Sequence, residues 1–213
     1  MTPPPAGGIK RVSVWSAPLR AAHWLMAAAT IALLLTGWLM SVAPDLYDAA
    51  RDYHFVTGYV LIFALALRLW LLWRGGGADG WRDLLPKPGY TRAAVEMLRF
   101  YLSFGRSSLP RWYAHNPLWA PVYLAWILLL VAQAAMGLAM KGGLFDTLLL
   151  EDLHALGAKT IAVVAAAHVV AVVLQDWRGE GSDVSAMISG YRIFPIHPPP
   201  PFPPPDARRS SGQ

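Results

Sequence analysis

Residues 153–175 read LHALGAKTIAVVAAAHVVAVVLQ, and this stretch decides how the rest of the chain is interpreted. It is apolar and long enough to cross the roughly 30 Å hydrocarbon core of a bilayer as one helix. Two histidines, His154 and His168, interrupt it fourteen residues apart. Fourteen helical residues advance about 21 Å and turn about 1400°, so the two imidazoles share a face to within about 40°. Because an imidazole inside a bilayer needs a partner, this helix predicts two stacked ligand sites.

The composition of the whole chain indicates an integral membrane protein. Hydrophobic residues make up 55% of the 213 residues and charged residues 15%, whereas a soluble domain carries about 25% charged residues. Ten Trp and eight Tyr fit the aromatic belts found at membrane interfaces. Cys is absent, which excludes thiolate-held iron–sulfur clusters, covalently attached c-type haem, disulfides and thiol catalysis. A redox cofactor would therefore need His, Met, Tyr or carboxylate ligands.

Four segments are apolar enough to span a membrane, at residues 21–43, 53–73, 117–140 and 153–175. We therefore expect an all-α integral membrane domain over residues 1–192, built as a four-transmembrane-helix bundle. The N-terminal stretch lacks the apolar run and cleavage site of a secretory signal, so we expect the first span to be retained. Residues 91–104 are expected to form a helix in the cytoplasmic membrane interface. Residues 193–213, too rich in proline for helix or sheet, are expected to form a tail that is disordered or extended as polyproline II.

The placement of basic residues predicts the orientation of the bundle. Fourteen of the eighteen Lys and Arg residues lie before the first span, between the second and third spans, or after the fourth. Only Arg51 and Lys141 lie in the two short loops. The positive-inside rule then makes both termini and the long connection cytoplasmic, and the two short loops face outward. Because the positive charge flanks the spans and does not form one patch, we expect no nucleic-acid partner.

Helix direction places four of the six histidines at two depths. His23 and His168 fall near the inner face, and His54 and His154 near the outer face. Each pair comes from two different helices, as a cofactor held between helices of a bundle requires. Two imidazoles alone make a poor structural zinc site, but they fill both axial positions of a porphyrin iron and leave none for oxygen or substrate. The pattern predicts two b haems that transfer electrons; hydrogen-bonded core histidines or a proton relay are the alternatives.

Three glycines and one arginine lie on the faces that carry these histidines. Gly37, Gly58 and Gly157 would let a flat macrocycle approach the backbone, although small residues also let membrane helices pack closely. Arg68 lies fourteen residues after His54, at the depth of the inner pair. We expect it to bind the carboxylate propionates of the inner haem. The alternative for Arg68 is snorkelling to the cytoplasmic boundary.

Three further polar residues are not assigned to either histidine pair. Lys159 is expected to snorkel outward or to meet a partner, because it lies off the His154 face by about 140°. His115 could bind quinone, bond a propionate or simply lie at the interface. His197, within the proline-rich stretch, is expected to be solvated.

Five pieces of the sequence, in order along the chain, resemble one known family. They are VWSAPLRAAHW at 14–24, HFVTGY at 54–59, HNPL at 115–118, LHALG at 153–157 and SAMISGYR at 185–192. They are similar to the b-type cytochrome subunits of membrane-bound nickel–iron hydrogenases and to the wider bacterial cytochrome b561 family. The resemblance implies a four-helix core, two b haems and quinone chemistry coupled to a partner protein. It implies axial ligation by the same four residues, His23, His54, His154 and His168, and it makes His115 a family histidine that is not an axial ligand.

We therefore interpret the chain as an electron-transfer subunit of an oxidoreductase complex, and leave open whether it reduces quinone itself. It would link a periplasmic redox partner, a hydrogenase-like enzyme or a c-type cytochrome, to menaquinone or ubiquinone in the membrane lipid. One alternative is a stand-alone oxidase of a small periplasmic reductant such as superoxide. The other is a membrane anchor without an electron role.

Overall fold

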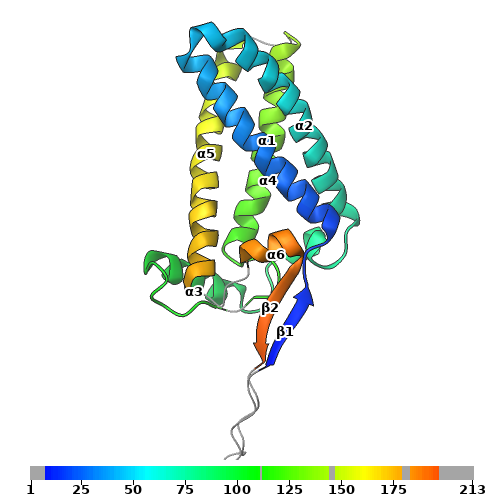
Figure 1. Cartoon of the computed structure of the whole chain (residues 1–213), viewed down its shortest axis with the longest axis vertical. Helices are drawn as coiled ribbons and strands as arrows, with labels where there is room; N and C mark the ends of the chain where they lie inside the picture. Colours follow the sequence, from blue (N-terminus) through cyan, green and yellow to red (C-terminus); the bar gives the residue numbers. More distant parts are fainter. Residues whose placement is uncertain (1–7, 111, 144–146, 179–182, 197–213) are drawn as a thin grey trace, which may run out of the picture.

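Four long helices form an elongated bundle (Figure 1). The computed structural model describes residues 8–110, 112–143, 147–178 and 183–196 of the chain. The long helices are α1 (Ala17–Val42), α2 (Tyr47–Arg74), α4 (Trp119–Lys141) and α5 (Thr147–Arg178). Each is long and apolar enough to cross a membrane. The predicted four-helix membrane architecture is confirmed. Helices α1, α2 and α5 begin before the predicted spans because the residues that precede each span continue the same hydrogen-bonding pattern.

Short connections make sequence neighbours pack as antiparallel pairs. The 3₁₀ helix η1 (Pro44–Leu46) joins α1 to α2. Ser16 caps α1 by accepting a hydrogen bond from the Leu19 amide at 3.2 Å, which satisfies one of the free N–H groups of the first turn. Helix α1 packs most extensively against α2, and α4 packs against α5. We call the end of the bundle with the start of α1 and the end of α5 the termini end, and the opposite end the loop end.

The core between the helices is narrow, and most apolar surface faces outward. Between 17% and 33% of the most hydrophobic window of each long helix is buried. The remaining apolar side chains face away from the bundle, which suits lipid and not water. All four long helices contribute to the central buried cluster: Met26, Ala29, Leu61, Ala64, Leu65, Leu130 and Ile161.

The smaller elements gather at the termini end (Figure 1). They are η2 (Gly77–Asp79), η3 (Trp81–Leu84), α3 (Tyr90–Leu102), α6 (Asp183–Ser189), β1 (Gly8–Ser13) and β2 (Tyr191–Ile196). The helix expected over residues 91–104 is present as α3. It buries Met97 and Phe100, while Leu98 and Leu102 stay exposed. This division gives α3 one face packed on the protein and one apolar face turned outward.

Strand β2 corrects part of the sequence interpretation. Residues 193–196 were expected to lack helix or sheet, but they pair antiparallel with β1, with Gly8 opposite Ile196 and Ser13 opposite Tyr191. Both strands of a two-stranded sheet are edge strands, where a proline such as Pro195 is tolerated. The pairing joins the two ends of the chain, so local composition alone did not predict it. The rest of the expected tail, residues 197–213, lies outside the described residues.

Gly190 connects α6 to β2 in a conformation that favours glycine. Its φ is 88°, and a Cβ there would lie 2.9 Å from the Trp15 carbonyl oxygen. The Gly190 carbonyl accepts hydrogen bonds from the amides of Val14 (2.9 Å) and Trp15 (3.1 Å). These two hydrogen bonds hold the segment before α1 against the residue that follows α6.

A single hydroxyl group links α3 to the long helices. Tyr101 Oη on α3 accepts hydrogen bonds from Asn116 Nδ2 at 3.0 Å, from Trp119 Nε1 at 2.9 Å and from Gln175 Nε2. Asn116 precedes α4, Trp119 is the first residue of α4, and Gln175 lies near the end of α5. Removing the hydroxyl would leave several partly buried donors without an acceptor.

We therefore predict that Tyr101→Phe destabilises the protein by about 1–3 kcal/mol, the usual effect of unpaired buried polar groups. For a chain of this size, each kcal/mol lowers the thermal midpoint by about 2–4 °C. Thermal unfolding in one detergent measures the change. Tyr90→Phe is the matched control, because no hydrogen bond involves the Tyr90 hydroxyl among the described residues. Equal midpoints for the two variants would contradict the prediction.

Candidate functional site

The structure brings the four membrane histidines together in the two pairs that their depths predicted. His23 on α1 and His168 on α5 have ring centroids 6.4 Å apart at the termini end. His54 on α2 and His154 on α5 have ring centroids 6.2 Å apart at the loop end. Neither pair is joined by a hydrogen bond among the described residues. Helix α5 thus supplies one histidine to each pair.

Both separations suit two imidazoles on opposite sides of one metal. A ring nitrogen binds a metal at about 2 Å. With ring radii of about 1.2 Å, two such ligands place their centroids about 6.4 Å apart. No group of three or more His, Cys, Asp or Glu that could hold a metal occurs in the part of the chain that the structure describes. The donor sets are therefore pairs of imidazoles, which fit the two axial positions of a haem.

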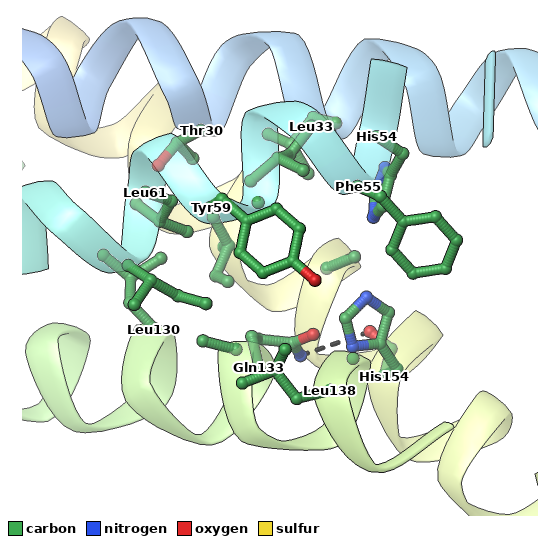
Figure 2. A pocket seen from close by; sticks show the side chains of 17 residues that line it. Thr30, Leu33, His54, Phe55, Tyr59, Leu61, Leu130, Gln133, Leu138 and His154 are labelled. Carbon is green, nitrogen blue, oxygen red and sulfur yellow. Dashed lines mark hydrogen bonds between the residues drawn. The ribbon is translucent and has the colours of Figure 1, made fainter. Parts of the chain in front are cut away.

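A cavity adjoins the loop-end pair, and all four long helices line it (Figure 2). It is partly open to the outside. Most of its lining is apolar. Figure 2 shows His154 directed into this space and Tyr59 and Gln133 at its walls. The space could hold a flat apolar group between the helices.

A threonine fixes the orientation of His54. Thr36 Oγ1 lies 2.9 Å from His54 Nδ1, and the hydroxyl donates to the Ala32 carbonyl at 2.8 Å. Because the hydroxyl proton is used in that bond, the oxygen accepts from Nδ1–H. The lone pair of His54 is then on Nε2, which is the arrangement that metal-ligating histidines use. Sequence reasoning missed Thr36; the available signal was a polar residue beside Gly37 in an apolar span.

His154 keeps a ring nitrogen available for a ligand. Its Nδ1 is buried and has no hydrogen-bond partner among the described residues. Its backbone carbonyl accepts a hydrogen bond from Gln133 Nε2 at 3.2 Å. Sequence reasoning also missed Gln133, which is 6% exposed within the third span. A buried polar atom without a partner costs about 1–3 kcal/mol, so a ligand at this ring would stabilise the site.

The glycines near the loop-end pair have different surroundings. A Cβ on Gly37 would lie 3.7 Å from His54 Cε1, and one on Gly137 would lie 3.8 Å from His154 Cε1. Each of these histidines therefore packs against a glycine of the neighbouring helix. Sequence reasoning missed Gly137. A Cβ on Gly58, which lines the cavity, would meet nothing within 4 Å, whereas one on Gly157 would overlap the Gln133 side chain.

Arg68 is fully buried at the termini end, with an exposed fraction of 0%. It donates from Nε to the Tyr123 hydroxyl and from Nη1 to the Asp79 backbone carbonyl at 2.9 Å. Its Nη2 is buried without a partner, and no carboxylate pairs with it among the described residues. It interacts electrostatically with His23. Full burial excludes the snorkelling interpretation, and the free N–H fits a carboxylate supplied by a ligand.

The remaining singled-out residues lie apart from the two pairs. Lys159 is exposed on α5. His115 lies before α4 and its Nδ1 is 2.8 Å from Asp83 Oδ2. His197 lies outside the described residues. Two tryptophans are ring neighbours of the termini-end pair: the Trp24 centroid lies 5.3 Å from that of His23, and the Trp119 centroid 5.4 Å from that of His168.

Comparison with known proteins identifies relatives over most of the chain. The family described as prokaryotic cytochrome b561 matches residues 14–190. The chain is 31% identical to a probable Ni/Fe-hydrogenase B-type cytochrome subunit from Cupriavidus necator, covering 87% of this chain and 88% of that protein. It is 28% identical to a protein of the same description from Rhodobacter capsulatus, covering 86% and 82%. A probable Ni/Fe-hydrogenase 1 B-type cytochrome subunit from Escherichia coli K12 is 21% identical, covering 84% and 89%. No solved structure matches the chain.

The contact between Gly157 and Gln133 gives a test of helix packing at the loop end. Gly157→Ala should destabilise the protein by about 1–3 kcal/mol, because the added methyl group overpacks against the Gln133 amide. In a Gln133→Ala background the same change should have little effect, since the obstructing side chain is gone. Thermal unfolding of the four proteins in one detergent gives this double-mutant cycle. A penalty that is equal in both backgrounds would show that Gln133 is not the obstacle.

Proposed function

This chain belongs to the prokaryotic cytochrome b561 family, and from that premise we propose that it is a dihaem cytochrome that carries electrons across a bacterial inner membrane. Family and relatives make it a multi-pass membrane protein of electron transfer with haem b. The observation that carries the dihaem proposal is the presence of two histidine pairs, each from two helices, with centroids 6.4 and 6.2 Å apart. Those separations support one haem per pair.

His23 and His168 would hold one haem, and His54 and His154 the other. A haem with two histidine ligands supplies reversible one-electron transfer and offers no vacant iron position to oxygen or substrate. The chain's own groups orient the ligands: Thr36 fixes the His54 ring. The apolar lining of the loop-end cavity suits the apolar face of a porphyrin. Arg68 would bind carboxylates at the termini end.

The proposed orientation puts the termini end in the cytoplasm. The connection between α2 and α4, the segment before α1 and the segment after α5 carry most of the basic residues. Under the positive-inside rule this distribution supports a cytoplasmic location for both termini. The His54–His154 pair then lies toward the periplasm and the His23–His168 pair toward the cytoplasm.

We further propose that a periplasmic redox protein exchanges electrons at the loop end. Three relatives carry names of Ni/Fe-hydrogenase cytochrome subunits, which supports a hydrogenase-like partner over a c-type cytochrome. Menaquinone or ubiquinone would exchange electrons at the termini end, taking up protons from the cytoplasm when it is reduced. Electron transfer through two such haems is reversible, so the direction of electron flow depends on the redox potentials of the two partners.

A stand-alone oxidase is the second candidate, because the loop-end cavity opens outward and would admit a small reductant such as superoxide. Purification from native membranes separates the two functions. Recovery of a hydrogenase-like protein with the cytochrome supports the first. Rapid superoxide-dependent quinone reduction by the isolated chain, with no partner recovered, supports the second. An anchor without an electron role would tolerate loss of all four histidines.

The ligand assignment predicts two separable haems. Purified wild-type protein should contain two b-type haems per chain, measured by reduced-minus-oxidised spectra and haem extraction. His54→Ala should lose the loop-end haem and His168→Ala the termini-end haem, so each variant keeps one, and the two remaining spectra should differ. His197→Ala should keep both. One haem per chain in the wild type would refute the dihaem proposal.

The role of Arg68 predicts a specific effect on the termini-end haem. Arg68→Gln removes a buried positive charge, which favours the oxidised form. The potential of that haem should fall by on the order of 60 mV, equivalent to a tenfold change in a one-electron equilibrium. Arg68→Lys keeps the charge and should lower it less. Redox titration followed by absorbance measures both haems, and an equal shift in the loop-end haem would argue against a local role.

A further inference from the structure

A histidine–carboxylate pair lies at the termini end, outside both histidine pairs of the bundle. His115 Nδ1 is 2.8 Å from Asp83 Oδ2, and Lys87 Nζ contacts the other oxygen, Oδ1, at 2.5 Å. The side chains of His115 and Asp83 are 13% and 12% exposed, while that of Lys87 is 62% exposed. His115 precedes α4 and Asp83 lies in η3, so the contact joins two elements of the connection between α2 and α4.

The charge state of Asp83 fixes the tautomer of His115. The pKa of Asp83 is lowered to about 2, first by the hydrogen bond from His115 and also by Lys87, while burial acts in the opposite direction. Asp83 is therefore ionised at neutral pH and accepts the hydrogen bond from Nδ1–H. Nε2 of His115 then carries the lone pair, and it has no hydrogen-bond partner among the described residues. A proton binding at Nε2 would form an imidazolium that the carboxylate stabilises.

Two aromatic rings lie against the ring of His115. The Trp15 ring lies edge-on at 5.0 Å, and the Tyr123 ring lies at 5.9 Å, both measured between centroids. Tyr123 Oη in turn accepts a hydrogen bond from Arg68, which interacts electrostatically with His23. Contacts between side chains therefore run from the exposed Lys87 through Asp83 and His115 to Tyr123. Tyr123 contacts Arg68 at the termini end.

We propose that His115 is a proton-binding site coupled to electron transfer at the His23–His168 pair; this rests on the proposed function. An electron taken up by a haem held by that pair would add negative charge in a region of low dielectric, and a nearby positive charge would stabilise it. Arg68 cannot lose its proton, and Asp83 stays ionised. The described groups that face His115 directly or through one neighbour are Asp83, Lys87, Tyr123, Arg68 and the uncharged Trp15. None of them is a histidine, so His115 is the imidazole of this group that can bind a proton. His115 gains the proton at Nε2 from the aqueous side.

Reduction at the termini end together with proton binding at His115 leaves the net charge of the protein unchanged. One electron arrives from the redox partner, and one proton arrives from water and forms an N–H bond at Nε2. On oxidation the electron leaves and the proton returns to water. No other bond forms or breaks.

Redox titrations of both haems between pH 5 and 9 test this proposal with His115→Gln. In the wild type the termini-end haem should become harder to reduce as pH rises, by up to a tenfold change in the equilibrium, or 59 mV, per pH unit. In His115→Gln this dependence should be largely lost, while the loop-end haem behaves as in the wild type. An unchanged dependence in His115→Gln would overturn the proposal.

Two further variants separate a proton-binding role from a structural one. Asp83→Asn removes the carboxylate that stabilises the imidazolium, so the pH dependence should move to lower pH. Lys87→Gln keeps the His115–Asp83 contact and should keep the dependence; its loss there would count against the proposal. Haem content is measured for every protein. Absence of two b-type haems in the wild type would refute the proposed function, whereas two haems with no pH dependence at the termini end would refute only this inference.

Discussion

The structure depends on two pairs of imidazole rings that face each other across helices without bonding to each other. Ring centroids 6.4 and 6.2 Å apart are too far apart for a direct hydrogen bond and suit a metal between them. In a membrane interior such rings need a partner. The 32-residue helix α5 carries one member of each pair and so sets their separation, while α1 and α2 supply the others. Glycines of the neighbouring helices let both loop-end rings fit.

The helices and the histidine pairs could be predicted from sequence because both follow from periodic signals. Hydropathy marks a span, and its direction gives the depth of each histidine. The roles of Thr36, Gln133 and Gly137 could not be predicted, since each depends on which residue of the neighbouring helix it meets. Strand β2 was missed for the same reason: its partner lies at the other end of the chain. Arg68 was expected to bind the propionates of a haem, but its contact with the Asp79 carbonyl was not expected, because it depends on how the following loop folds back.

The two ends of the bundle differ in a way that accords with different tasks. The loop-end pair adjoins an apolar cavity that opens outward, and the hydrogen bond that Thr36 Oγ1 accepts from His54 Nδ1–H orients the His54 ring. The other pair lies at the termini end, where α3, α6 and the two-stranded sheet gather (Figure 1). Its surroundings contain a buried guanidinium, a tyrosine hydroxyl and a histidine–carboxylate contact. Under the proposed function, electron exchange at the loop end would need only proximity to the partner. Proton-linked chemistry at the termini end would need titratable groups, and such groups lie there.

One interval connects the two sites on every long helix. Fourteen residues separate His23 from Gly37 on α1, His54 from Arg68 on α2, Tyr123 from Gly137 on α4, and His154 from His168 on α5. In each case one member lies with the loop-end pair and the other with the termini-end pair or its arginine. Because fourteen residues bring a helix back to nearly the same face about 21 Å further along, each helix presents one face to both sites. A one-residue insertion between the members on any helix would rotate one of them away by about 100°, which explains why the interval is common to all four.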